Sequence, residues 1–108
     1  MSRKKHHSVY VVGLSRTVLK DRRFVRKNPD HDPDKPCLYV GMTGLSPEER
    51  LENHKAGHKS NRYVREYGLE LRRELYEQYN PMTYDEARAM EVDLAEKLRT
   101  EGYAVWQK

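Results

Sequence analysis

Five side chains of types suited to hydrolytic chemistry stand at separate points of this 108-residue chain. They are Tyr10, Tyr39, Arg50, His54 and Glu91. A tyrosine can orient or activate water, and an arginine can bind a phosphate with its planar fork of donors. A carboxylate can hold a hard metal ion through oxygen. Because the five are spread along the sequence, they can act together only if the fold gathers them.

The two tyrosines lie in short apolar runs that predict β-strands. Residues 7–14 and residues 37–41 are apolar on both faces, a pattern typical of central strands. Gly41 and Gly44 mark the turn after the second strand. Because tyrosine is common in strands for packing reasons alone, the two tyrosines gain meaning only from the residues that follow.

The segment after Gly44 predicts a helix that carries two of the candidate residues. Ser46 suits the N-cap, Pro47 the first helical position, and Glu49 the partner residue of a capping box. Arg50 and His54 are four residues apart and therefore share one face, which must pack inward. We expect these two side chains to face an anionic group; a local ion-pair network is the alternative.

The last predicted helix, residues 84–100, places an acid within its apolar stripe. Thr83 and Glu86 form a second capping-box pattern at its start. Glu91 falls inside the stripe at about 100° per residue. The apolar members of the stripe are Ala87, Met90, Leu94 and Leu98. A buried carboxylate is costly unless it is paired, so we expect Glu91 to meet either an arginine or a metal ion.

Basic residues concentrate in an insertion, residues 15–36, between the first two strands, and in an N-terminal arm, residues 1–7. We expect the insertion to be an extended loop or a loose hairpin. It is either a surface that contacts a nucleic-acid backbone or a solvated loop. The candidate nucleic-acid contacts are Arg16, Lys20, Arg22, Arg23, Arg26, Lys27 and Lys55.

Three further segments complete the expected fold. Residues 61–67 predict a short helix, residues 69–75 a strand with one buried face, and residues 103–106 a short terminal strand or packed tail. The order of these elements predicts one α+β domain over residues 1–108. Its expected core is a small antiparallel three-stranded sheet flanked by helices.

Composition limits the classes of function. The 21 Lys and Arg residues exceed the 17 Asp and Glu residues, and the net charge of +4 favours a polyanionic partner. A single cysteine, Cys37, excludes an internal disulfide and a multi-cysteine metal site. No apolar segment approaches the roughly 18 residues that a membrane span needs, so we expect a cytoplasmic protein without a membrane partner.

Taken in order, these residues resemble the GIY-YIG nuclease family. The tripeptide SVY at residues 8–10 stands where the first family motif does, and YVG at residues 39–41 stands where the second does. Arg50 follows Gly41 by nine positions, and His54 lies one helical turn later. The segment EARAMEVDLAEKLR resembles the family helix whose glutamate binds a metal. The late asparagine of the family has no match near the C-terminal GYAVW.

The resemblance implies a metal-dependent endonuclease that hydrolyses phosphodiester bonds. Glu91 would hold one Mg²⁺ or Mn²⁺ ion, and Arg50 would bind the scissile phosphate. Tyr10 would orient or deprotonate the water, with Arg50 or the metal supplying the positive charge that such a base needs. Tyr39 and His54 would complete the hydrogen-bond network, with His54 as a proton shuttle.

DNA is the expected substrate, and RNA is the alternative. The sequence contains no recognisable base-reading module, so a protein partner that selects the target is one route to specificity. The competing interpretation of the whole chain is a non-catalytic nucleic-acid-binding module that keeps the same fold. Metal-dependent cleavage distinguishes the two.

Overall fold

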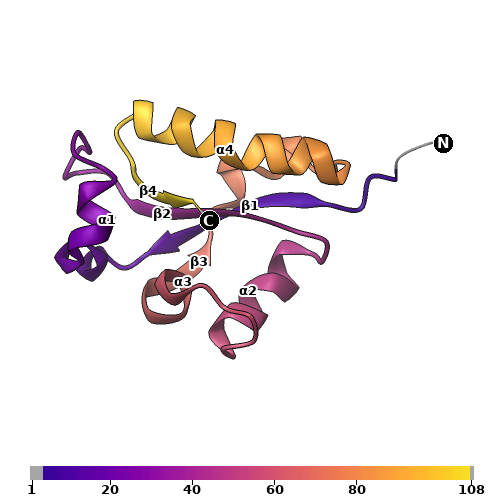
Figure 1. Ribbon diagram of the computed structural model, residues 1–108, viewed down its shortest axis with the longest axis horizontal. Helices are drawn as coiled ribbons and strands as arrows, with labels where there is room; N and C mark the ends of the chain where they lie inside the picture. The colour runs from indigo at the N-terminus through magenta and orange to yellow at the C-terminus, as the bar shows by residue number, and fades with distance from the viewer. Residues whose placement is uncertain (1–3, 108) are drawn as a thin grey trace.

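Runs of β-branched residues alternate with helix-forming segments along the chain, and the computed structural model, which describes residues 4–107, arranges them as an α+β domain (Figure 1). The strands are β1 (Ser8–Leu14), β2 (Cys37–Thr43), β3 (Gly68–Leu71) and β4 (Ala104–Gln107). The α-helices are α1 (Arg22–Arg26), α2 (Pro47–Lys55), α3 (Arg62–Tyr67) and α4 (Tyr84–Thr100). Short 3-10 helices are η1 (Arg16–Lys20), η2 (Arg73–Leu75) and η3 (Glu77–Tyr79).

Within the described residues, the strands form one four-stranded sheet in the order β3-β1-β2-β4. β1 pairs antiparallel with both β2 and β3, whereas β4 runs parallel to β2. The α+β class is confirmed, but the prediction of a purely antiparallel, three-stranded sheet was wrong. α4 provides the physical reason, because a helix after β3 carries the chain back along the sheet and lets the terminal segment join β2 in parallel.

Helices cover both faces of this sheet. α4 lies along one face, and α2 and α3 lie on the other (Figure 1). β1 and β2 are therefore buried on both faces, which explains their lack of polar alternation. The part of the chain that the structure describes contains no helix long and apolar enough to cross a membrane.

Residues 16–20 and 22–26 of the insertion between β1 and β2 are helical, so the prediction of a loop or hairpin was wrong for these parts, whereas residues 27–36 form turns and irregular chain. The helical part forms η1 and α1, and helical turns let its separated apolar residues Val18 and Phe24 point inward, where both are completely buried. Phe24 packs against Tyr63 of α3 at 5.7 Å and Trp106 of β4 at 6.5 Å, measured between ring centroids. An extended segment would leave part of this apolar surface exposed.

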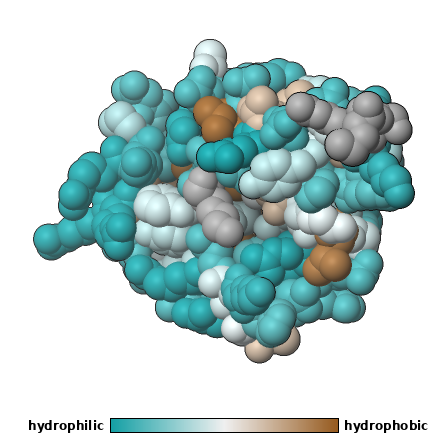
Figure 2. All heavy atoms as spheres, turned by 45° about the vertical axis from the view of Figure 1, so that its right-hand side comes forward, coloured by the Kyte–Doolittle hydropathy of each residue, from teal (hydrophilic) through white to brown (hydrophobic). Residues whose placement is uncertain are grey.

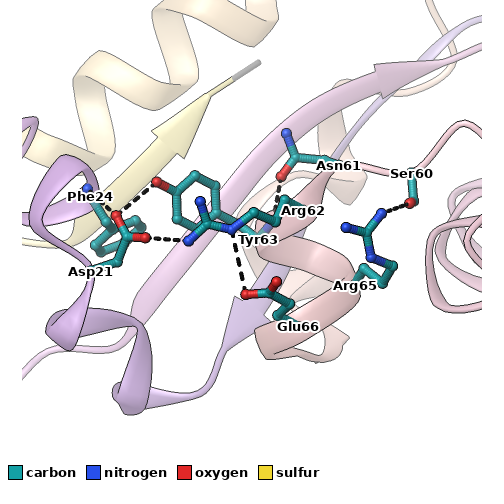
Figure 3. Close-up of polar contacts among 8 residues, drawn as sticks. All are labelled: Asp21, Phe24, Ser60, Asn61, Arg62, Tyr63, Arg65 and Glu66. Carbon is teal, nitrogen blue, oxygen red and sulfur yellow. Dashed lines mark hydrogen bonds and ion pairs between the residues drawn. The ribbon is translucent and has the colours of Figure 1, made fainter.

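A polar contact joins the insertion to α3. Asp21 caps α1 by accepting a hydrogen bond from the Phe24 backbone N–H at 3.0 Å. The same carboxylate accepts a hydrogen bond from the Tyr63 hydroxyl at 2.9 Å and forms an ion pair with Arg62 (Figure 3). These contacts, with the Phe24 ring beside them, hold the N-terminal half of α3 against the insertion.

The predicted strand over residues 69–75 is correct only in its first part. The Arg72 backbone N–H still donates to the Val11 carbonyl at 2.8 Å. Beyond it the chain turns into η2, closed by the bond from the Leu75 N–H to the Arg72 carbonyl at 3.0 Å. The same alternation of leucine with charged residues is thus found in both a strand and a 3-10 turn, so it did not show where the strand ends.

The two predicted helix starts are present. Thr83 and Glu86 form a complete capping box at α4, whose bounds agree with the prediction. At α2, Ser46 accepts from the Glu49 backbone N–H at 3.2 Å. The Glu49 carboxylate accepts from the Ser46 hydroxyl at 2.9 Å rather than from a backbone N–H, so this cap is only half of a capping box.

Gly41 permits a close contact between β1 and β2. It lies opposite Tyr10 in the register of β1 and β2. A Cβ atom at Gly41 would lie 2.7 Å from the Tyr10 hydroxyl oxygen and 2.9 Å from an atom of the Tyr39 ring. Both distances are shorter than van der Waals contact, so only glycine fits beneath the two rings.

We therefore predict that Gly41→Ala lowers the free energy of unfolding by about 1–3 kcal/mol, the usual cost of overpacking a core. Gly13→Ala is the matched control, because a Cβ on that β1 glycine would meet nothing closer than 3.5 Å. Urea denaturation of both variants measures the difference. Equal destabilisation of the two would contradict the close contact at Gly41.

Candidate active site

The register of the sheet places the two motif tyrosines side by side. Tyr10 pairs with Gly41, which is two residues from Tyr39 on the same face of β2. The two rings lie 6.1 Å apart between centroids, and each residue is only 1% exposed. The space that Gly41 leaves open is thus filled by tyrosine rings.

His54 joins the tyrosines from α2. It is the buried residue of that helix, with no exposed surface. Its Nε2 atom lies 2.8 Å from the Tyr10 hydroxyl oxygen, and its ring centroid lies 5.7 Å from that of Tyr39. α2 therefore contacts the sheet through a histidine where a core helix would ordinarily bury an aliphatic side chain.

A backbone group of the next helix fixes the tautomer of His54. The Asn61 N–H donates to His54 Nδ1 at 3.0 Å, so Nδ1 acts as an acceptor. The neutral ring must then carry its proton on Nε2 and donate it to the Tyr10 oxygen. Asn61 was not among the predicted site residues, although its type at the start of α3 indicates an N-cap, and it does cap that helix.

The electrostatic balance at Tyr10 favours the neutral phenol. Burial raises the pKa of Tyr10 to about 12, and Arg50 and a hydrogen bond from Tyr39 offset this only in part. Burial likewise raises the pKa of Tyr39 far above its ordinary value, and Tyr10 and the Glu91 carboxylate raise it further. Arg50 therefore offsets the desolvation of the phenolate only in part, and the expected role of Tyr10 as a base assisted by Arg50 or a metal stays a prediction.

Arg50 lines a hollow formed by the end of β2, by α2 and by the chain that follows α2. We call it the Arg50 hollow; it has a volume of about 370 Å³ and is lined by Met42, Thr43, Leu45, Arg50, Asn53, His58 and Lys59. The guanidinium donates to the Lys59 carbonyl at 2.8 Å and the His58 carbonyl at 3.4 Å. It also reaches Tyr10, whose pKa it lowers. A guanidinium has five N–H donors, so this arrangement leaves capacity for an anionic ligand.

Glu91 lines a second hollow beside the first. We call it the Glu91 hollow; it has a volume of about 410 Å³ and is lined by His7, Met42, Thr43, Tyr84, Arg88 and Glu91. Glu91 is 7% exposed, which confirms that the acid in the apolar stripe is buried. Its Oε1 atom accepts a hydrogen bond from Gln107 Nε2 at 2.7 Å. The sequence predicted an arginine or a metal ion as the partner of Glu91, and the amide of Gln107 was not predicted.

Gln107 is therefore a candidate site residue that the sequence did not indicate. It belongs to β4 and pairs with Val40 of β2. Val40 lies on the face opposite to Tyr39, so Gln107 and Glu91 meet on the α4 side of the sheet. No motif surrounds Gln107, and its role depends on the parallel pairing of β4 with β2.

The candidate residues thus approach the end of β2 from opposite faces of the sheet. The two hollows share Met42 and Thr43, the last two residues of that strand. In the described chain β4 reaches only to Gln107, alongside Val40, so β2 extends beyond it. The negative charge of the Glu91 carboxylate raises the pKa of both Tyr10 and Tyr39.

The donors present fit a single hard cation held mainly by water. Among residues 4–107, no three or more His, Cys, Asp or Glu side chains gather into a metal-binding group. Glu91 is a lone carboxylate on an open hollow, and Mg²⁺ commonly binds through one or two carboxylates while keeping several waters. A zinc-type cage of several side chains is a poor match for this donor set.

The predicted nucleic-acid contacts lie apart from the two hollows. α1, which carries Arg22, Arg23 and Arg26, lies at one end of the 46 Å long axis, and the end of β2 lies toward the other (Figure 1). Arg16 donates to the Pro33 and Lys35 carbonyls and so closes the insertion. Lys55 donates to the Leu69 carbonyl at 2.8 Å. The remaining members, Lys20 and Lys27, are exposed, and residues 1–3 of the basic arm lie outside the described residues.

We predict that Tyr10→Phe and His54→Leu are energetically coupled. Each single change leaves the partner group buried without its hydrogen bond, which costs about 1–3 kcal/mol. The double variant should lose less stability than the sum of the two singles, with a coupling of at least about 0.5 kcal/mol. A double-mutant cycle by urea denaturation measures this, and strict additivity would contradict the bond between them.

A pH prediction follows from the raised pKa of Tyr10. An unfolded tyrosine ionises near pH 10, whereas folded Tyr10 keeps its proton up to about pH 12. Between these values the unfolded chain has lost a proton that the folded chain retains, so stability falls as pH rises. The slope from Tyr10 is at most about 1.4 kcal/mol per pH unit.

Denaturant unfolding across this range should show a shallower fall for Tyr10→Phe than for the unchanged chain. Tyr84→Phe is the control, because Tyr84 is 51% exposed and its hydroxyl is not enclosed. An identical slope in Tyr10→Phe and the parent would show that Tyr10 is not the buried group responsible.

Comparisons with protein-family models, with curated proteins and with solved structures each found no match to this chain. The chemistry assigned to this protein therefore depends on its own residues and their geometry. The features that matter are the enclosed pair of Tyr10 and His54, the two hollows at the end of β2, and the carboxylate of Glu91.

Proposed function

We propose that this protein is a metal-dependent endonuclease that hydrolyses phosphodiester bonds of DNA, as GIY-YIG nucleases do. The observation that carries the proposal is the pairing of the two hollows at Met42 and Thr43. One hollow presents Arg50 and the other presents Glu91, above an enclosed tyrosine and histidine network. A phosphodiester needs both a cation for its oxygens and a group that holds a metal or water beside it.

Arg50 is the group placed to bind the scissile phosphate. Its guanidinium is anchored at the Lys59 and His58 carbonyls, so its orientation is set before a ligand arrives. Lys59 and His58 belong to the same hollow, which adds cationic and hydrogen-bonding character around the phosphate position. A planar fork that is already oriented can stabilise charge as it grows on the phosphoryl oxygens.

Tyr10 would orient the attacking water once substrate binding opens a path to its hydroxyl, because the residue is 1% exposed and lines neither hollow. Its oxygen lies 2.8 Å from His54 Nε2, and this hydrogen bond limits the directions in which its own hydroxyl group can point. With a pKa raised to about 12, the neutral phenol is the resting form near pH 7. Tyr10 could accept a proton only where substrate binding brings additional positive charge close to it.

Glu91 would hold the metal ion on the other side of β2. A bound Mg²⁺ or Mn²⁺ would supply Lewis-acid stabilisation of the phosphoryl oxygens. Gln107 donates to one carboxylate oxygen and thereby restricts the rotation of the side chain. The Glu91 carboxylate is therefore already held in place at the Glu91 hollow before a metal ion binds.

The surface at this end suits a polyanion better than an apolar partner. Figure 2 turns this end toward the viewer and shows mostly hydrophilic residues, with hydrophobic ones in small separate areas. The two hollows together contain the basic side chains Arg50, Lys59 and Arg88 against the single acid Glu91. Contacts of this kind bind a nucleic-acid backbone without reading its sequence.

The direct experiment is cleavage of labelled DNA by the full chain with Mg²⁺ or Mn²⁺. The panel contains duplex, flapped, branched and single-stranded DNA, with the corresponding RNA strand as a second arm. Cleavage that chelation with EDTA abolishes supports the proposal. Salt-sensitive binding without any cleavage would instead support the non-catalytic binding module.

We predict that Glu91→Gln lowers the cleavage rate at least about 100-fold while leaving DNA affinity within a few-fold. The substitution keeps the size of the side chain and removes the charge that a metal needs. Glu96→Gln is the matched control, because it makes the same change on an exposed position of α4. Unchanged cutting by Glu91→Gln would contradict the metal-binding role.

A further inference from the structure

The proposed hydrolysis requires a proton donor that the predicted site residues do not provide. When a phosphodiester bond breaks, the departing oxygen must gain a proton or a strong hydrogen bond. His54 was the expected proton shuttle, but its side chain is completely enclosed. Its Nδ1 accepts from Asn61 and its Nε2 contacts Tyr10, so it cannot reach a departing oxygen in either hollow.

A different histidine lines the Glu91 hollow. His7 precedes β1 and is held by two backbone hydrogen bonds to Met82, at 2.9 Å and 2.7 Å. Its ring meets that of Tyr84 edge-on, with centroids 5.3 Å apart and an interplanar angle of 85°. A Cβ atom at Gly44 would lie 3.3 Å from His7 Nε2, so the ring approaches the turn after β2 closely. The position of this imidazole is therefore well defined.

One side-chain nitrogen of His7 makes no contribution to the hydrogen bonding of the fold. Within the described residues, His7 Nδ1 is buried without a hydrogen-bond partner. Such a buried unpaired atom is unfavourable and is uncommon in folded proteins. The chain retains it beside a hollow that also contains Arg88 and the Glu91 carboxylate. Because Nδ1 is buried, Nε2, which lies beside the exposed Gly44 at the hollow, is the ring nitrogen that a ligand can reach.

We propose that His7 is a catalytic residue that donates a proton to the departing oxygen of the phosphodiester, an inference that depends on the proposed function. The bond from phosphorus to the departing oxygen breaks, and its electron pair stays on that oxygen, which takes the proton of His7 Nε2. The bond from phosphorus to the oxygen of the attacking water forms in the same reaction. The proton released by that water and the proton that restores His7 are exchanged with solvent, so the step balances.

The test compares two versions of the oligonucleotide that the parent protein cuts best. The first substrate has the natural oxygen at the departing position, and the second has sulfur there. Which oxygen departs is first determined from the chemical termini of the cleavage products. A thiolate leaves without a proton donor. His7→Gln should therefore cut the oxygen substrate about 100-fold more slowly, and the sulfur substrate at nearly the parental rate.

His6→Gln is the matched control, because it changes the neighbouring histidine, which is exposed. It should cut both substrates at parental rates. Thermal unfolding checks that His7→Gln is folded; the variant loses no hydrogen bond at Nδ1 and only the edge-on contact with Tyr84, so its midpoint should fall by no more than about 4–8 °C. In a second variant, His7→Gly, added imidazole should restore cutting of the oxygen substrate.

The outcomes separate this inference from the proposed function. Parental cutting of the oxygen substrate by His7→Gln would overturn the role of His7 and leave the nuclease proposal intact. An equal loss on both substrates would also overturn it, since a binding or structural role would act on oxygen and sulfur alike. Failure of the parent protein to cut either substrate would contradict the nuclease proposal and this inference with it.

Discussion

The contact between Tyr10, Gly41 and His54 is the constraint on which the arrangement of the site depends. Gly41 has no side chain, so the Tyr10 ring can lie across β2 beside Tyr39, with its hydroxyl 2.8 Å from His54 Nε2. That bond provides the buried anchor of α2, a helix whose other side chains are mostly polar. The position of Arg50, one turn earlier on α2, follows from this anchor. A single close approach in the sheet thus sets the orientation of the cationic side of the site.

The second half of the site depends on β4 and α4. Parallel pairing brings Gln107 alongside Val40, and Gln107 holds the Glu91 carboxylate by a hydrogen bond of 2.7 Å. In the described part of the chain, β2 continues past β4 to Thr43, so groups on opposite faces of the sheet can approach each other at this end of β2. Burying a carboxylate among apolar residues costs free energy. Glu91 instead lines an open hollow, which water and a ligand can enter.

The insertion is connected to the same network although it lies far from the hollows. Asp21 caps α1 and holds Arg62 and Tyr63 of α3 (Figure 3). The residue before them, Asn61, caps α3 and donates its backbone N–H to His54 Nδ1. The helical insertion therefore helps to place the group that fixes the tautomer of His54. Its exposed basic residues face solvent and remain candidates for contact with a nucleic-acid backbone.

Most local elements and the burial of single residues could be predicted from the sequence, because they depend on short-range patterns of residue type. Strand runs, the caps at Ser46 and Thr83, and the burial of Glu91 were all visible in apolar spacing and residue type. The tertiary structure alone decided the helical form of the insertion, the parallel β4 and the partners Gln107 and Asn61. It also decided that His54 is enclosed while His7 lines a hollow. These features depend on which segments meet across the sheet, and no local pattern encodes a contact between residues so far apart in the chain.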